Sequence, residues 1–142
     1  MQFALDEARM ILPGVQALFG FQLIAVFNQR FDDVLGAPER AIFLVALVLI
    51  TAACALVMAP AAYHRQVERG QVSEHLLVFT SHLLALALLS LMIAITCDVY
   101  LVAWVVTGDT AISIAIATLC LCGFALLWYA IPLSAKWRST RK

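Results

Sequence analysis

Four long apolar stretches constrain the fold of this chain more than any other feature of its sequence. They cover residues 11–27, 41–62, 76–97 and 111–133. A helix needs roughly 17–25 mostly apolar residues to cross a hydrocarbon core about 30 Å thick. Backbone groups in lipid must satisfy their own hydrogen bonds, and the sequence lacks the strand alternation typical of membrane barrels. The pattern therefore predicts an all-α fold, an integral membrane four-helix bundle, with residues 1–142 forming a single membrane domain.

The composition favours a lipid environment. Hydrophobic residues make up 64% of the chain and charged residues 13%, whereas soluble domains average about 45–50% apolar and about 25% charged residues. A soluble fold of this composition would expose large apolar patches, which soluble monomers rarely do. The formal net charge is zero, which gives no reason to expect nucleic acid as a partner. We therefore expect the lipid bilayer to be the main partner.

The basic residues predict the orientation of the bundle. Seven of the nine Lys and Arg residues lie in the N-terminal arm, the second loop and the basic tail 134–142, which four spans place on one side. The first loop holds the other two beside three acidic residues, and the third loop holds none. By the positive-inside rule, the N- and C-termini are expected in the cytoplasm. His64 and Arg65 then mark the cytoplasmic boundary of the second span.

Two segments fit more than one arrangement. Residues 3–12 are amphipathic, and they either lie along the inner leaflet or extend the first span. Residues 99–106 are apolar but lie between Asp98 and Asp109. They either prolong the third helix, dip into the outer headgroups or cap the bundle.

Gln16 lies inside the first span, on a helical face that it shares with Arg9, Pro13 and Gly20. These residues share a face because their spacings return to nearly the same angle around a helix. The stripe either lines a polar cavity or serves packing, with Gln16 hydrogen-bonded to another helix. We favour packing as the simpler interpretation.

His82 and Asp98 are the other polar residues singled out in the third apolar stretch. His82 can relay protons, ligate a metal or haem, or pack with an ordinary hydrogen bond, and we favour packing. Asp98 would be a functional candidate if it were buried in the membrane. Its position at the predicted end of the span instead favours exposure at the outer interface. Because the two residues lie about 160° apart around a helix, they cannot form a direct pair.

The cysteines and the missing enzyme motifs argue against catalytic chemistry. All four cysteines lie in apolar runs or at the end of one, where Cys behaves as a small hydrophobic residue. The sequence contains no phosphate-binding glycine loop, nucleophile elbow or zinc-ligand spacing. We therefore expect no enzymatic activity, no metal site and no cofactor.

Three motifs carry a family resemblance. They are Leu12-Pro13-Gly14-Val15-Gln16 followed by Leu18-Phe19-Gly20-Phe21, then Phe27-x-x-Arg30-Phe31, then Ala59-Pro60-Ala61-Ala62-Tyr63-His64-Arg65. With Glu7 and Arg9, the chain resembles an uncharacterised family of small bacterial four-helix membrane proteins that is catalogued only as a domain of unknown function. The resemblance covers roughly the first two-thirds of the chain. It implies four spans in the bacterial inner membrane, and some members carry an automatic label as sodium/proton antiporters. This chain has Asp6-Glu7-Ala8-Arg9 where relatives have Glu-Leu-Arg.

The polar residues in the spans lead to a first hypothesis, ion or proton translocation. In this hypothesis Gln16 and His82, with Arg9 or Asp98, line the route. A four-span chain is small for a transporter with a central site, so a pore would require a homo-oligomer.

A second hypothesis is a non-transporting accessory or scaffold protein that binds a partner through its apolar faces and basic tail. Small-residue spacings allow close helix packing within one chain or between copies of it, which favours the homo-oligomer of the first hypothesis. They are Ala55-xxx-Ala59, Ala111-xxx-Ala115 and Ser113-xxx-Ala117.

Overall fold

The computed structural model describes residues 2–27, 34–67 and 74–132, including the side chains of 10–27, 34–63 and 78–132. The regular elements in these ranges are all helical, which confirms the predicted all-α class. They are α1 (Gln2–Val26), α3 (Ala37–Val67), α4 (Glu74–Thr107) and α5 (Thr110–Ala125), and α5 continues into a π-helical turn, η1 (Leu126–Ala130).

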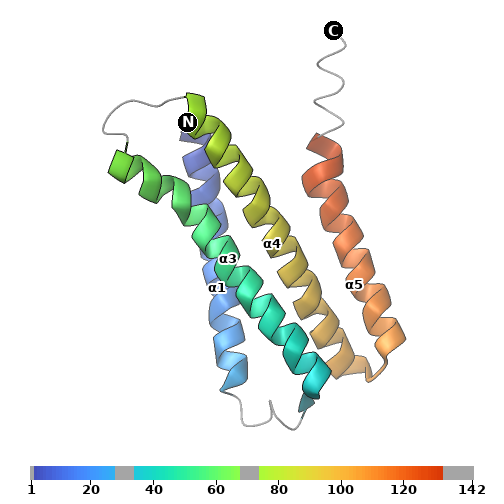
Figure 1. Ribbon diagram of the computed structural model, residues 1–142. Coiled ribbons are helices and arrows are strands. Elements are labelled where there is room, and N and C mark those ends of the chain that lie inside the picture. Colours follow the sequence, from blue (N-terminus) through green and yellow to red (C-terminus); the bar gives the residue numbers. More distant parts are fainter. Residues whose placement is uncertain (1, 28–33, 68–73, 133–142) are drawn as a thin grey trace.

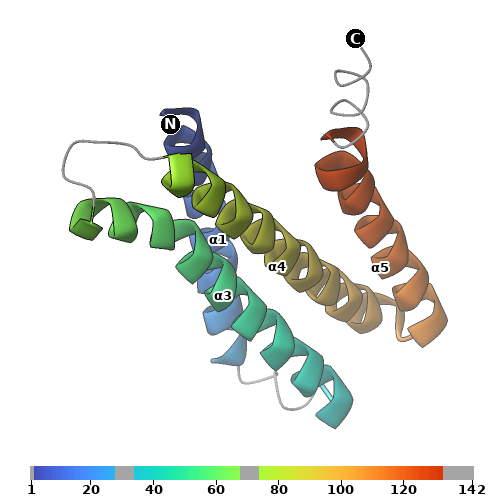
Figure 2. The same cartoon turned by 45° about the horizontal axis from the view of Figure 1, so that its top comes forward.

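The helices run alternately up and down, so each is antiparallel to the next along the chain (Figure 1). α3 and α4 pack along one another, and α1 packs mainly against α3. α5 packs against α4 at the edge of the bundle, away from α1 and α3, in both views (Figures 1 and 2). The arrangement leaves one long side of α5 without a neighbouring helix.

Within the described residues, three helices contain segments that are long and apolar enough to cross a membrane. These segments are Ala37–Tyr63, Val78–Thr107 and Thr110–Ala130. The apolar part of α1, Met10–Val26, is shorter and lies at the lower limit of about 17 residues for a span. The lengths and composition of the helices fit a membrane protein.

Both segments for which the sequence allowed more than one arrangement are helical. Residues 3–12 belong to α1, which continues through Pro13 without a break in the helix. Residues 99–106 prolong α4, which ends at Thr107. α4 is therefore about one-half longer than the apolar stretch 76–97 that predicted it.

A two-residue link reverses the chain between α4 and α5. Gly108 has a φ of 65° and donates its amide to the Trp104 carbonyl at 2.8 Å, a helix ending for which glycine is favoured. The Asp109 side chain then accepts hydrogen bonds from the amides of Ala111 and Ile112 at 2.7 and 3.2 Å. Such capping satisfies donors that the first turn of a helix leaves free.

Small side chains line the contact between α3 and α4. Ala46 and Ala53 on α3 and Ala94 on α4 are almost completely buried. Ala53 and Ala94 form a core cluster with Val15 of α1 and Ile50 of α3. Because lipid is as apolar as these side chains, close backbone approach and van der Waals packing hold such helices together.

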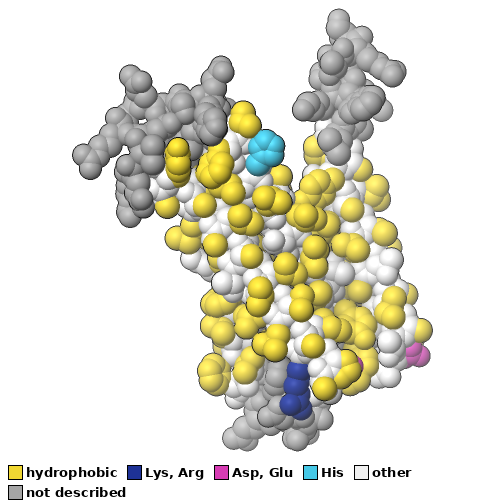
Figure 3. Space-filling model, in the orientation of Figure 1, with side chains coloured by type: hydrophobic (Ala, Val, Ile, Leu, Met, Phe, Trp, Pro, Cys, Tyr) yellow, Lys and Arg dark blue, Asp and Glu magenta, His cyan; other side chains and the backbone are white. Residues whose placement is uncertain are grey.

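On the face seen in Figure 3, apolar side chains are spread over the whole described part of the bundle. Only 11% of the α5 span is buried inside the chain, and its buried residues are Ser113 and Ala117. The spacing Ser113-xxx-Ala117 therefore serves packing within one chain. Ala111 and Ala115, by contrast, are exposed.

Candidate functional site

The in-span residues proposed from sequence do not meet in the folded chain. Gln16 is exposed on α1, and His82 is exposed on α4. The Nδ1 atom of His82 lies 2.8 Å from the Val78 carbonyl oxygen of the same helix. Asp98 is partly buried further along α4. Within the described side chains, no hydrogen bond joins any two of Gln16, His82 and Asp98.

Three other predicted residues lie outside the described side chains. The backbone of Arg9 belongs to α1 and the backbones of His64 and Arg65 belong to α3. The basic tail 134–142 lies outside the described residues altogether. The roles predicted for these residues stay predictions.

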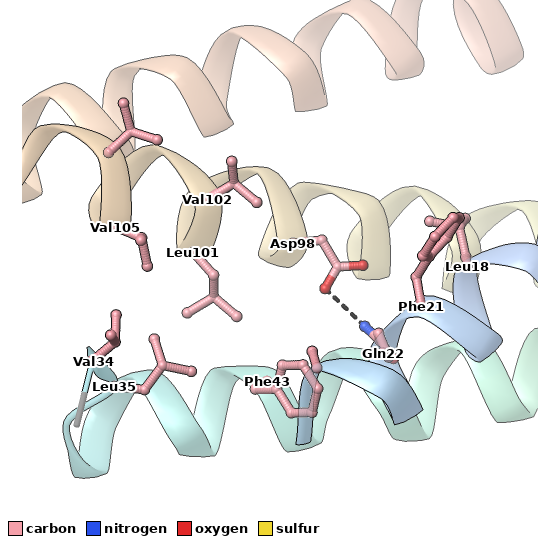
Figure 4. A pocket seen from close by; sticks show the side chains of 12 residues that line it. Leu18, Phe21, Gln22, Val34, Leu35, Phe43, Asp98, Leu101, Val102 and Val105 are labelled. Carbon is pink, nitrogen blue, oxygen red and sulfur yellow. Dashed lines mark hydrogen bonds between the residues drawn. The ribbon is translucent and has the colours of Figure 1, made fainter. Parts of the chain in front are cut away.

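A carboxyl–amide pair joins α1 to α4. The Nε2 atom of Gln22 donates a hydrogen bond of 2.7 Å to Oδ1 of Asp98, as Figure 4 shows. Gln22 is only 5% exposed and Asp98 is partly buried. The two residues are 76 positions apart in sequence, so only the folding of the bundle brings them together.

Asp98 is partly buried, which corrects the expectation that its side chain is exposed. α4 ends at Thr107, so nine further helical residues follow Asp98 (107 − 98 = 9). At about 1.5 Å per residue they extend the helix by roughly 13 Å. Asp98 therefore lies inside the apolar segment Val78–Thr107. The expectation was wrong because it placed the end of the helix at Cys97, immediately before the carboxyl.

Gln22, in contrast, was not proposed as a site residue from sequence. It follows Val15 by seven residues, which is nearly two helical turns, so both lie on one side of α1. Val15 is 1% exposed and belongs to the bundle core. Pro13 and Gln16 are exposed instead. Pro13 and Gln16 therefore face away from the core, and among the described side chains Gln16 makes no interhelical hydrogen bond.

The Gln22 amide has one unused acceptor. Its Oε1 atom is buried and has no hydrogen-bond partner, which typically costs about 1–3 kcal/mol. A primary amide offers N–H donors to an ionised carboxylate and an oxygen acceptor to a protonated carboxyl or a cation. By rotating, this amide can therefore partner Asp98 in either protonation state.

The pair lines a cavity of about 500 Å³ between α1, α3 and α4. Twelve residues line it, and all except Gln22 and Asp98 are apolar. Figure 4 shows Leu35 and Leu101 on one side of the pair and Leu18 on the other. The volume lies within the range of about 300–1,000 Å³ that is typical of small-molecule sites.

The cavity opens at the surface between α1 and α4. Phe21 of α1 and Val102 and Val106 of α4 line it and are 72%, 63% and 76% exposed. These apolar rim residues belong to segments that suit a lipid environment. An apolar molecule dissolved in a bilayer would therefore reach the cavity laterally.

Metal chemistry finds no support in the described part of the chain. Within it, no group of three or more His, Cys, Asp or Glu residues is arranged to hold a metal ion. The four cysteines are free thiols: Cys54, Cys97, Cys120 and Cys122. The chemistry that this site offers is the binding of a proton or another cation at one carboxyl, with one amide as its hydrogen-bonding partner.

Comparison with known proteins assigns the chain to a family. The model of a family described as "Family of unknown function (DUF6328)" matches residues 2–132. The match extends beyond the first two-thirds that carry the recognised motifs, and it confirms the identification of an uncharacterised family. No curated protein and no solved structure matches the chain.

Proposed function

We propose a function on the premise that this chain belongs to the DUF6328 family, a family of unknown function. In our proposal the protein translocates protons or other small cations across a membrane as a homo-oligomer. Asp98 binds the cation and Gln22 is its hydrogen-bonding partner. The route predicted from sequence through Gln16 and His82 is replaced by a site at the junction of α1 and α4.

The observation that carries the proposal is the carboxyl–amide pair inside an apolar helical segment. A charged side chain at the centre of a bilayer costs about 2.5–3.5 kcal/mol on insertion scales, and ionisable residues at such depth usually serve ion or proton pathways. An aliphatic residue would pack in this place without that cost. Cation binding best explains the presence of a carboxyl beside a buried amide at this place.

The topology proposed for this function has four spans, with α1 as the first. Its apolar part is short, but the helix begins at Gln2 and can extend through the headgroup region. We propose that both termini are cytoplasmic, following the distribution of Lys and Arg. The membrane proposed is the bacterial inner membrane.

The homo-oligomer is proposed because one chain offers a single carboxyl site and no continuous polar path among its described side chains. The exposed Gln16 on α1 and the exposed Ala111 and Ala115 on α5 suit contacts between copies. Small residues allow close helix approach, and an amide in lipid gains from a partner on a second helix.

A flux assay in proteoliposomes tests the proposal. We expect purified protein to collapse an imposed pH or sodium gradient, and Asp98→Asn to reduce the flux at least about tenfold because the site loses its ionisable group. Asp109→Asn is the matched control: it removes a carboxylate at the α4–α5 link but keeps a capping residue. Absence of flux, or equal flux in Asp98→Asn and wild type, would refute the proposal.

A second candidate function is that of a membrane accessory protein. The observation that favours it is the exposed apolar side of α5, only 11% of whose span is buried. Crosslinking in native membranes followed by purification distinguishes the two functions. A stoichiometric protein partner crosslinked through α5 supports the accessory role, whereas crosslinks between copies of this chain support the homo-oligomer.

A further inference from the structure

We propose that the cavity beside Asp98 binds an amphiphilic ammonium ion, an apolar amine whose protonated nitrogen carries at least one N–H. The inference goes beyond the proposed function by assigning an organic cation to the same site, and the role of this ligand as cargo rests on that function. The binding itself follows from three features of the site: its charge, its unused acceptor and its apolar lining.

The charge of the site selects a cation. Asp98 is the only ionisable residue among the twelve that line the cavity, and no Lys or Arg is among them. The one hydrogen bond that Asp98 accepts from a described side chain comes from Gln22, a neutral amide. An ionised Asp98 therefore has no described counter-ion in its cavity, and a bound cation would supply one.

The unused acceptor selects a cation with N–H groups. The Oε1 atom of Gln22 is buried and has no hydrogen-bond partner. The Gln22 side chain lines the cavity, and its Nε2 atom lies 2.7 Å from Oδ1 of Asp98. In the observed rotamer Oε1 is closed to the cavity, but a half-turn of the amide exchanges it with Nε2 and turns it toward Asp98. An ammonium nitrogen in the cavity can then donate one hydrogen bond to this amide oxygen and another to the carboxylate.

The apolar lining selects a ligand with a hydrocarbon part. Leu35, Phe43 and Leu101 are buried residues that line the cavity, and Figure 4 places Leu35 and Leu101 beside the pair. A hydrated inorganic cation would leave this surface unused, whereas an alkyl chain covers it and gains from its burial. A phospholipid headgroup fits less well, because its phosphate would find no basic side chain among the lining residues.

Binding of decylammonium tests the proposal directly. The full chain is reconstituted in phosphatidylcholine nanodiscs, and the heat of binding is measured by titration calorimetry with empty nanodiscs as the reference. We expect saturable binding to one site per chain. Asp98→Asn should weaken it at least about tenfold, since charged hydrogen bonds contribute about 1.5–3 kcal/mol. Asp109→Asn should leave the affinity unchanged.

Two further measurements separate loss of binding from loss of fold. Val105 lines the cavity and is 50% exposed, so Val105→Trp should narrow the cavity without disturbing the core, and it should abolish binding. Decyltrimethylammonium carries the same charge and chain but no N–H, and it should bind at least about tenfold more weakly than decylammonium. Equal affinity for the two ligands, or binding unaffected by Val105→Trp, overturns the proposal.

The remaining outcomes distinguish this inference from the proposed function. No saturable binding together with Asp98-dependent flux overturns the inference and leaves the function standing. Binding that depends on Asp98 without any flux supports the ammonium site and removes the function. Displacement of decylammonium by phosphatidylethanolamine added to the nanodiscs would show that the ligand is a lipid headgroup and would overturn our assignment to a free amine.

Discussion

At the scale of single residues, reversible cation binding at Asp98 requires an amide at position 22. An apolar residue at position 22 would leave the carboxyl without its hydrogen bond, and a basic residue would neutralise it permanently. The amide does neither, because it carries no charge and can offer a donor or an acceptor. This property connects the observed hydrogen bond with reversible cation binding.

Gln22→Glu tests the importance of a neutral partner. The variant places a second carboxyl beside Asp98, and two adjacent carboxylates cannot both ionise without strong repulsion. The folded state should therefore hold a shared proton that the unfolded chain releases. Raising the pH removes this proton, so the variant should lose stability from pH 6 to pH 9 and recover it on acidification. Thermal unfolding in detergent measures this effect, and a pH profile identical to that of wild type would count against the arrangement.

The sequence located Asp98 and His82 as polar residues in an apolar setting, but it could not tell which of them faces the interior. In a soluble helix, the apolar face identifies the core. In a membrane helix the lipid-facing side is apolar too, so this signal is lost. Gln22 was not selected as a site residue for the same reason. Its spacing of seven residues from Val15 identifies it as an inward-facing residue only once Val15 is known to be buried.

At the scale of elements, the helices followed from hydropathy, whereas their ends and contacts did not. The apolar stretch 76–97 identified α4, but Asp98 looked like its end because charges usually leave the hydrocarbon. Residues 99–106 then continued the helix to Thr107, where Gly108 and Asp109 supply a glycine ending and a helix cap. Those two residues are a clearer boundary signal than the charge at Asp98.

The contact between α3 and α4 should tolerate no increase in side-chain size. Ala94 is completely buried against α3 in the bundle core, so Ala94→Leu should destabilise the protein by roughly 1–3 kcal/mol through overpacking. Ala41 on α3 is exposed, and Ala41→Leu should change stability by no more than about 0.5 kcal/mol. Unfolding in mixed detergent–SDS micelles provides the comparison. Similar losses of stability in the two variants would show that Ala94 does not lie in the contact between α3 and α4.

At the scale of the whole molecule, long-range side-chain hydrogen bonds connect helices of the described chain. Tyr129 of η1 donates to the Ala85 carbonyl of α4 at 3.0 Å, and Gln22 of α1 donates to Asp98 of α4 at 2.7 Å. α1 packs mainly against α3 and much less against α4. The Gln22–Asp98 bond is therefore both the centre of the proposed site and a direct connection between the first helix and α4.

A double-mutant cycle with Gln22→Leu and Asp98→Leu, measured by reversible unfolding in mixed micelles, tests this connection most directly. Each single substitution leaves the other polar group buried without its partner, whereas the double substitution removes both groups. We predict that the double variant is less destabilised than the sum of the single variants, with a coupling of roughly 0.6–2 kcal/mol. Effects that add to within about 0.3–0.5 kcal/mol would mean that the two side chains do not interact in the membrane domain, and the proposed cation site would lose its basis.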